Sequence, residues 1–222
     1  MSLMKSAHLS CDVYNSHTSL MRSYIHVKPR ILSLQGEPFA LAICEKKHHA
    51  NNLYMVFRGC KDIDEVVECI NTKVKKPFMS RSMYVNTAFW EKYESLKDDI
   101  EDVIHSYENI DSIVFAGHSL GGAMAQLAGT FGELSCDVTC HTYGAPYVGD
   151  HKFKRLLEDK LVEHKRCTVK QDIIPKIKFN PRLVHNGSEL ELESVSKMSF
   201  PLNIYDHHTC INYLKCLKQN GY

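Results

Sequence analysis

The 222-residue sequence has no run of about 18 apolar residues, so it offers no candidate transmembrane helix. Its first segment, Met1 to Asn15, mixes Lys, His, Ser and Asp and lacks the apolar core of a secretory leader, which predicts an intracellular, cytoplasmic protein or one packaged in a virion. With 27 basic and 26 acidic residues the net charge is only +1. This balance gives no reason to expect a nucleic acid as a partner.

The nine cysteines include no Cys-x-x-Cys pair, so the usual spacing of a zinc site is missing. Their odd number and the missing leader favour free thiols in a reducing compartment over a disulfide framework. The sequence also has no Gly-Lys-Ser/Thr phosphate loop and no paired glycines at dinucleotide spacing. We therefore expect neither a metal nor an organic cofactor, and the sequence leaves the oligomeric state open.

Short apolar runs alternate with helical patterns along the chain, without a repeat or a linker. This pattern predicts one α/β domain over residues 1–222, with a central, mostly parallel sheet flanked by helices. Strands are expected at 39–43, 53–57, 113–116, 138–143 and around 168–169, and helices at 89–107, 123–131 and 209–217. A polar turn is expected at 45–52, and Asn186-Gly187 predicts a β-hairpin between 183–185 and 190–192.

Gly117-His118-Ser119-Leu120-Gly121 stands between the strand expected at 113–116 and a helix rich in small residues. A strand, this Gly-x-Ser-x-Gly pattern and a helix together form the signature of a nucleophile elbow. The two glycines permit a sharp turn, and the N-terminal amides of the helix point to where an oxyanion would develop. The alternative is a glycine-rich turn with an incidental serine, but the flanking strand and helix favour the elbow.

A serine hydroxyl becomes a good nucleophile only when an imidazole accepts its proton and a carboxylate orients that imidazole. In α/β-hydrolases the chain order is serine, carboxylate, histidine. Asp172 follows a predicted strand and fits the carboxylate, although a turn aspartate is an equally good interpretation of its position. Asp150 and Asp206 are the competing carboxylates. The base is His207 or His208, because two adjacent histidines cannot both point at the serine.

Six motifs follow one another along roughly three quarters of the chain. They are Val56-Phe57-Arg58-Gly59, Ala116-Gly117-His118-Ser119-Leu120-Gly121-Gly122-Ala123, Thr142-Tyr143-Gly144-Ala145-Pro146-Tyr147-Val148-Gly149-Asp150, Gln171-Asp172-Ile173-Ile174-Pro175, His185-Asn186-Gly187-Ser188-Glu189-Leu190, and His208 five residues before Tyr213. In this order they resemble the motifs of the class 3 lipases, the fungal triacylglycerol lipase-like group of the α/β-hydrolase superfamily.

The resemblance implies an α/β-hydrolase fold and a serine ester hydrolase that acts on acyl lipids, of the lipase or phospholipase type. It implies that Ser119 is the nucleophile, Asp172 the acid and His208 the base. It also implies that the backbone amides of Leu120 and Cys60 bind the oxyanion. The family usually has Thr or Ser where this chain has Cys60, and a thiol is a weaker hydrogen-bond donor than a hydroxyl.

Two other functions fit the sequence: a lipase-fold protein that binds an acyl ligand or a partner without turnover, and a small-ester or thioester hydrolase without interfacial activation. Lys61 to Cys69 is acidic and has a helical pattern where the family has its lid tryptophan. Lys73 to Met79 combines cations with apolar side chains. It is a candidate contact with a membrane or lipid-droplet surface, and a solvated loop is the alternative.

Overall fold

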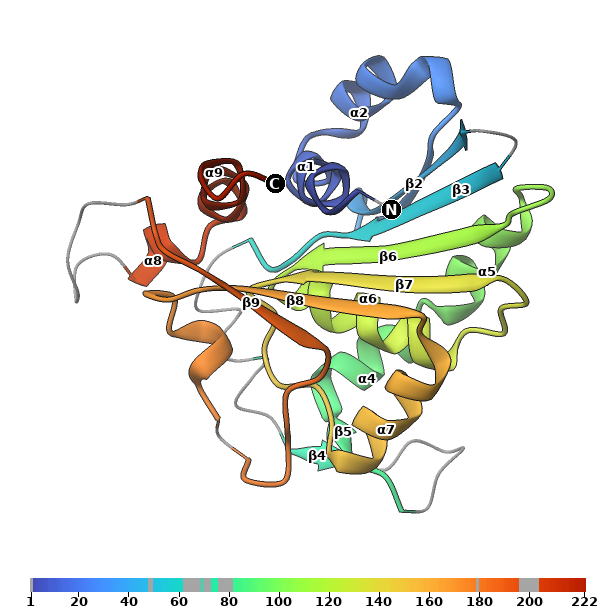
Figure 1. Cartoon of the computed structure of the whole chain (residues 1–222). Helices are drawn as coiled ribbons and strands as arrows, with labels where there is room; N and C mark the ends of the chain where they lie inside the picture. Colours follow the sequence, from blue (N-terminus) through green and yellow to red (C-terminus); the bar gives the residue numbers. More distant parts are fainter. Residues whose placement is uncertain are drawn as a thin grey trace.

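The structure is a computed structural model that describes residues 2–47, 50–61, 69, 73–75, 82–178, 180–195 and 204–222. Its centre is a seven-stranded sheet in the order β1-β2-β3-β6-β7-β8-β9 (Figure 1). The strands are β1 Arg30–Leu34, β2 Glu37–Lys47, β3 Ala50–Phe57, β6 Ser112–His118, β7 Asp137–Tyr143, β8 Glu163–Val169 and β9 Ser188–Leu192. From β3 onward the neighbours pair in parallel, whereas β2 is antiparallel to β1 and β3. The predicted, mostly parallel α/β sheet is confirmed.

Helices cover both faces of this sheet (Figure 1). They are α1 Leu3–Asp12, α2 His17–Tyr24, α4 Thr87–Glu94, α5 Lys97–His105, α6 Leu120–Phe131, α7 His151–Lys160, α8 Ile204–His207 and α9 Cys210–Gln219, with short 3-10 turns η1 Ile25–Val27 and η2 Ile174–Lys176 and a small ribbon of β4 Val74–Lys75 with β5 Val85–Asn86. In β6, Ile113 and Phe115 enter the core under α4 to α7, while Val114 and Ala116 enter the core under α1 and α9. A strand buried on both faces needs such a continuous apolar run.

The single helix predicted over 89–107 is wrong, because the structure has two helices, α4 and α5, that meet at Ser95 and Leu96. The Ser95 hydroxyl donates to the carbonyl of Lys92 over 2.9 Å, a local bond that competes with helix continuation. Leu96 is only 4% exposed and joins the core. The apolar spacing remains helical through the break, so periodicity alone could not reveal it.

The predicted hairpin at 183–192 is also wrong. The Val184 amide donates to the carbonyl of Gly149, and β9 pairs in parallel with β8. Gly187 does have the positive φ of a turn residue, 76°, but the Asn186 side chain donates to Gln126 of α6 and directs the preceding segment away from β9. The polar turn predicted at 45–52 is shorter than expected, since β2 and β3 pair as far as Lys47 and Ala50.

Two of the predicted segments lie mostly outside the described residues. Of the acidic segment 61–69 only its two end residues are described, and of the segment 73–79 only the first three. Among the described residues, no helix is long and apolar enough to cross a bilayer. All nine cysteines are free thiols.

Candidate active site

The elbow predicted at Ser119 is present between β6 and α6. Ser119 has φ 55° and ψ −125°, a strained conformation for a residue with a side chain. Its amide donates to the carbonyl of Tyr143 over 2.9 Å, and its carbonyl accepts from Gly122 over 2.9 Å. These bonds, together with the packed strand and helix on either side, hold the strained turn in place.

The glycines of the motif are required by close backbone approach. A Cβ on Gly117 would lie 2.2 Å from the carbonyl carbon of Gly121. A Cβ on Gly121 would lie 2.1 Å from the carbonyl oxygen of Phe57, at the end of β3. Both contacts are with backbone atoms, which cannot move aside as a flexible side chain can. The motif therefore fixes α6 against β3 and β6 and places Ser119 at the carboxyl edge of the sheet.

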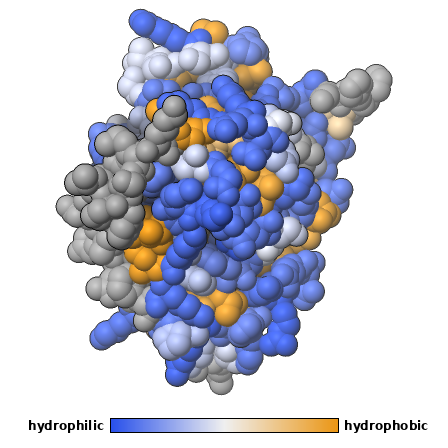
Figure 2. All heavy atoms as spheres, turned by 60° about the vertical axis from the view of Figure 1, so that its left-hand side comes forward, coloured by the Kyte–Doolittle hydropathy of each residue, from blue (hydrophilic) through white to orange (hydrophobic). Residues whose placement is uncertain are grey.

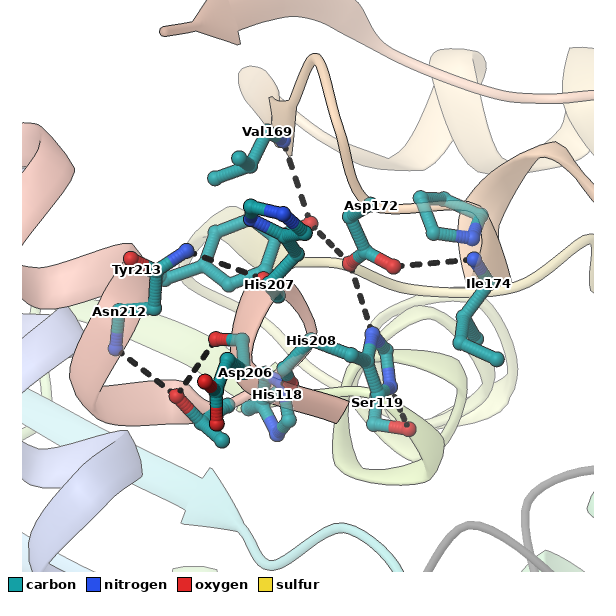
Figure 3. A network of polar contacts seen from close by, with 12 residues as sticks. His118, Ser119, Val169, Asp172, Ile174, Asp206, His207, His208, Asn212 and Tyr213 are labelled. Atoms are coloured by element: carbon teal, nitrogen blue, oxygen red, sulfur yellow. Dashed lines mark hydrogen bonds and ion pairs between the residues drawn. The ribbon is translucent and has the colours of Figure 1, made fainter. Parts of the chain in front are cut away.

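Ser119, His208 and Asp172 form one continuous line of hydrogen bonds (Figure 3). The Ser119 Oγ lies 2.9 Å from Nε2 of His208, and the His208 Nδ1 lies 2.7 Å from Oδ2 of Asp172. A carboxylate can only accept, so Nδ1 carries the proton and Nε2 is left to accept from the serine hydroxyl. All three side chains are buried. The arrangement can remove a proton from Ser119 and stabilise the resulting imidazolium.

Asp172 is held as a carboxylate inside the protein. Its Oδ2 accepts from Tyr213 Oη over 2.6 Å in addition to His208, and its Oδ1 accepts from the Ile174 amide over 2.9 Å. Burial raises the pKa of Asp172, but the charge on His208 and these hydrogen bonds outweigh burial and lower the pKa below its ordinary value. The carboxylate is therefore ionised at neutral pH, as a partner for an imidazolium must be. Tyr213 comes from α9, which also fixes His208 in place.

His118, the residue directly before the nucleophile, links the elbow to the backbone of His208. Its Nε2 donates to the carbonyl of His208 over 2.6 Å. Because burial and the nearby charge of His208 lower the pKa of His118 to about 3, its ring is neutral and Nδ1 is an acceptor. The Tyr14 hydroxyl donates to that Nδ1 over 3.0 Å and accepts from the Gly59 amide over 3.0 Å.

The residues expected to bind an oxyanion lie beside the nucleophile. Leu120 is the first residue of α6, whose N-terminal amides have no partner within the helix. Cys60 is 8% exposed and follows Gly59, where an added Cβ would lie 3.1 Å from the Cβ of Ser119. Both backbones therefore adjoin Ser119.

The alternative acid and base residues take other positions. Asp150 caps the N-terminus of α7 by accepting from the amides of Lys152 and Phe153. Asp206 is exposed on α8. His207 is buried, and its Nδ1 lies 2.9 Å from Oγ of Ser194. Of the two adjacent histidines, only His208 reaches Ser119 in the structure.

A sequence model of the family Lipase (class 3) matches residues 54–181, more than half of the chain. This chain belongs to the class 3 lipases. The family predicted from the motifs is thus confirmed. The matched segment includes Ser119 and Asp172, whereas Tyr14 and His208 lie on either side of it.

Relatives of this class 3 lipase include a lipase of Rhizopus oryzae, 29% identical over 136 residues, which are 56% of this chain and 34% of that protein. Phospholipase A1-IIbeta of Arabidopsis thaliana is 29% identical over 139 residues, 54% of this chain and 33% of that protein. The aligned part thus spans about a third of these curated relatives. The solved Rhizomucor miehei lipase propeptide complex superposes with a TM-score of 0.66 at 20% identity, over 86% of this chain and 67% of that one. This likeness establishes the α/β-hydrolase fold.

Sequence analysis did not find Tyr14, the contact of His118 with His208, or the role of Tyr213 as a donor to Asp172. His118 could have been suspected from its place inside the motif. Tyr14 carries no local signal, because the residues that it contacts lie 45 and 104 positions later in the chain.

Proposed function

We propose that this chain is a serine carboxylic-ester hydrolase that acts on acyl lipids, as a lipase or phospholipase, through Ser119, His208 and Asp172. The hydrogen-bonded line from Ser119 Oγ to Asp172 Oδ2 is the observation that carries the proposal. The names of its relatives, lipase and phospholipase A1, support the class of substrate.

In the proposed reaction, Ser119 Oγ attacks the ester carbonyl carbon while His208 Nε2 takes the hydroxyl proton. The electron pair of the carbonyl moves onto its oxygen, where the amides of Leu120 and Cys60 donate to the charge. When the tetrahedral intermediate collapses, the ester bond breaks and His208 gives its proton to the leaving alcohol. An acyl group then remains on Ser119.

Deacylation repeats these steps with water as the nucleophile. His208 takes a proton from water, the hydroxide attacks the acyl carbonyl, and the proton returns to Ser119 Oγ as the fatty acid leaves. Asp172 remains ionised throughout and stabilises the imidazolium of His208 in both halves. Removing Ser119 or His208 is therefore expected to cost far more activity than any change outside this line.

The test is hydrolysis of p-nitrophenyl esters of two to twelve carbons, with Ser119→Ala beside the parent protein. We expect kcat to fall by roughly 10⁴-fold or more in the variant, since the nucleophile and base act as a unit. Equal rates for the two proteins would refute the proposal. Ser33→Ala is a matched control, because it makes the same change at an exposed serine of β1.

The choice between a lipid and a small soluble ester is tested with the same proteins. Higher rates on long-chain esters above their critical micelle concentration would support an acyl-lipid substrate. An optimum at two to four carbons with no response to micelles would favour the small-ester alternative and contradict this part of the proposal.

A further inference from the structure

Helix α2 projects from the top of the molecule, above the sheet edge that β1 forms (Figure 1). Of its eight residues only Leu20 is fully buried, and the half-buried Tyr24 packs against the same core, so two side chains fix the helix to the protein. The helix begins three residues after Tyr14, which contacts the elbow. Most of its surface thus faces solvent, although it lies close in the chain to the active site.

Two large apolar side chains on this projection are exposed. Met21 is 37% exposed and Ile25, the first residue of η1, is 69% exposed. Their spacing of four residues places them on the same side of the helix. In Figure 2, orange and blue spheres adjoin at the top of the molecule, at the height of α2 in Figure 1. Burying this apolar pair in an apolar environment would be favourable.

The charge around the apolar pair has one sign. From residue 13 to residue 36 the sequence contains no Asp or Glu, although the whole chain is nearly neutral. The same stretch contains Arg22 and Lys28, both of them exposed. Arg30, in β1, shares the sheet face of Leu32 and points away from α2. The stretch also contains His17 and His26, which are exposed as well. The projection is therefore a cationic surface around an apolar centre.

The carboxylates that flank this stretch have partners of their own. Asp12 accepts a hydrogen bond from the Tyr24 hydroxyl. Glu37, on the other side, forms ion pairs with Arg58 and Lys61. Glu37 is paired with its two cations, whereas Asp12 keeps its negative charge beside Tyr24 and offsets one positive charge. Arg22 and Lys28 together outweigh it, so a net positive charge remains for an anionic partner.

An anionic lipid bilayer fits this combination. Cationic segments with a few apolar side chains bind at the level of the head groups, and they need no complementary partner surface. A folded protein partner would need about 1,000 Å² of buried area, whereas an eight-residue helix is only about 12 Å long. The apolar pair is too small to supply such an interface, but it is enough to insert between lipids.

We propose that α2 and η1 form a docking surface for an anionic lipid bilayer, with Met21 and Ile25 inserted among the head groups and Arg22 and Lys28 on the lipid phosphates. Its purpose rests on the proposed function, because docking brings Ser119 to a layer that contains acyl esters. Binding itself requires no hydrolysis and can be measured separately.

The experiment measures sedimentation of the full chain, carrying Ser119→Ala so that no lipid is consumed, with phosphatidylcholine vesicles that contain 0 or 30% phosphatidylserine. We expect binding only with phosphatidylserine, and weaker binding in 0.5 M salt. Arg22→Gln with Lys28→Gln should weaken binding about 25-fold, or fivefold per cation, which corresponds to about 1 kcal/mol each. Met21→Ser with Ile25→Ser should weaken it by at least about tenfold.

Matched controls come from α7, which lies on the opposite face of the sheet (Figure 1). Lys152→Gln with Lys160→Gln removes two exposed cations there, and Val162→Ser removes an exposed apolar side chain just beyond the helix. Both control proteins should bind the vesicles as the parent does. Equal effects of the control and α2 substitutions would show a general charge effect and overturn the proposal.

Two further results would overturn the proposal: no vesicle binding by the parent, or equal binding to both vesicle types. A third would be a parent that binds no vesicles and self-associates, and that Met21→Ser with Ile25→Ser makes monomeric. That result would show that the surface binds a second copy of the chain. Hydrolysis of soluble p-nitrophenyl butyrate is measured in parallel with the parent protein, in which Ser119 is intact. If the parent does not hydrolyse this ester, the proposed function is refuted and the docking result still stands. The α2 substitutions, made in the presence of Ser119, should leave the rate of hydrolysis unchanged.

Discussion

Replacing Tyr14 with phenylalanine is the sharpest test of how the site is assembled. The hydroxyl donates to His118 and accepts from the Gly59 amide, each over 3.0 Å. His118 in turn holds the carbonyl of His208, and Gly59 precedes Cys60. The Tyr14 hydroxyl therefore connects the backbone of His208, through His118, with the backbone of Gly59, next to the Cys60 amide.

The expected cost follows from the two groups that lose their partner. A buried donor or acceptor left unsatisfied costs about 1–3 kcal/mol, so the loss of two partners in Tyr14→Phe should lower the free energy of unfolding by roughly 2–6 kcal/mol. A displacement of about 1 Å in a catalytic group can cost about 100-fold in rate. We therefore expect kcat to fall between about 10- and 100-fold while KM changes little.

The assay combines urea unfolding with p-nitrophenyl ester kinetics at a temperature where every variant is folded. Tyr24→Phe is the matched control, because it also removes a part-buried tyrosine hydroxyl bonded to a side chain, Asp12. That variant should lose stability and keep its kcat. If Tyr14→Phe behaves like Tyr24→Phe, the hydroxyl only stabilises the fold and the positioning role is refuted.

Three further predictions concern the same site and its surroundings. Cys60→Ser should turn over equally or up to about 100-fold faster, since a hydroxyl donates better than a thiol; a slower variant in ester kinetics would contradict this. His208→Ala should lose roughly 10⁴-fold or more in kcat, whereas His207→Ala should stay within about tenfold of the parent, and the reverse ranking would refute the assignment of the base. Burial lowers the pKa of His118 to about 3 and of His141 to about 4, so the unfolded chain takes up protons below about pH 6.5 while the folded chain does not. The contribution of these neutral histidines to the free energy of unfolding is therefore complete above that pH and should fall by about 2 kcal/mol per histidine from pH 7 to pH 5. A urea midpoint that stays constant over this range would contradict the prediction.

The elbow could be predicted because its requirements are local. A buried strand, two glycines and a small-residue helix follow one another in the sequence, and the collision that excludes a side chain at Gly117 is with Gly121 inside that segment. The collision at Gly121 is with Phe57 of β3, which no local pattern shows. The pairing of Asp172 and His208 with Ser119 was different. Chain order narrowed the choice of residues, and only resemblance to a family selected His208 over His207.

What the sequence could not reveal depends on contacts between distant segments. Tyr14 lies far from the elbow in sequence, and Val184 joins Gly149 although an Asn-Gly turn beside it suggested a hairpin. The break between α4 and α5 was hidden for another reason. No glycine or proline marks it, and Leu96 keeps an apolar residue where the helical pattern expects one.

Because the chain is synthesised from its N-terminus, the Ser119–His208 pair is completed late in translation. Ser119 is made near the middle of the chain, but the histidine that activates it is made 89 residues later. At translation rates of about 5–20 residues per second, the nucleophile exists for roughly 4–18 s before its base. A nascent chain that ends before His208 therefore contains Ser119 without the imidazole that would accept its proton. In the proposed mechanism, activation of Ser119 waits until His208 has been made and α9 has packed beside α1.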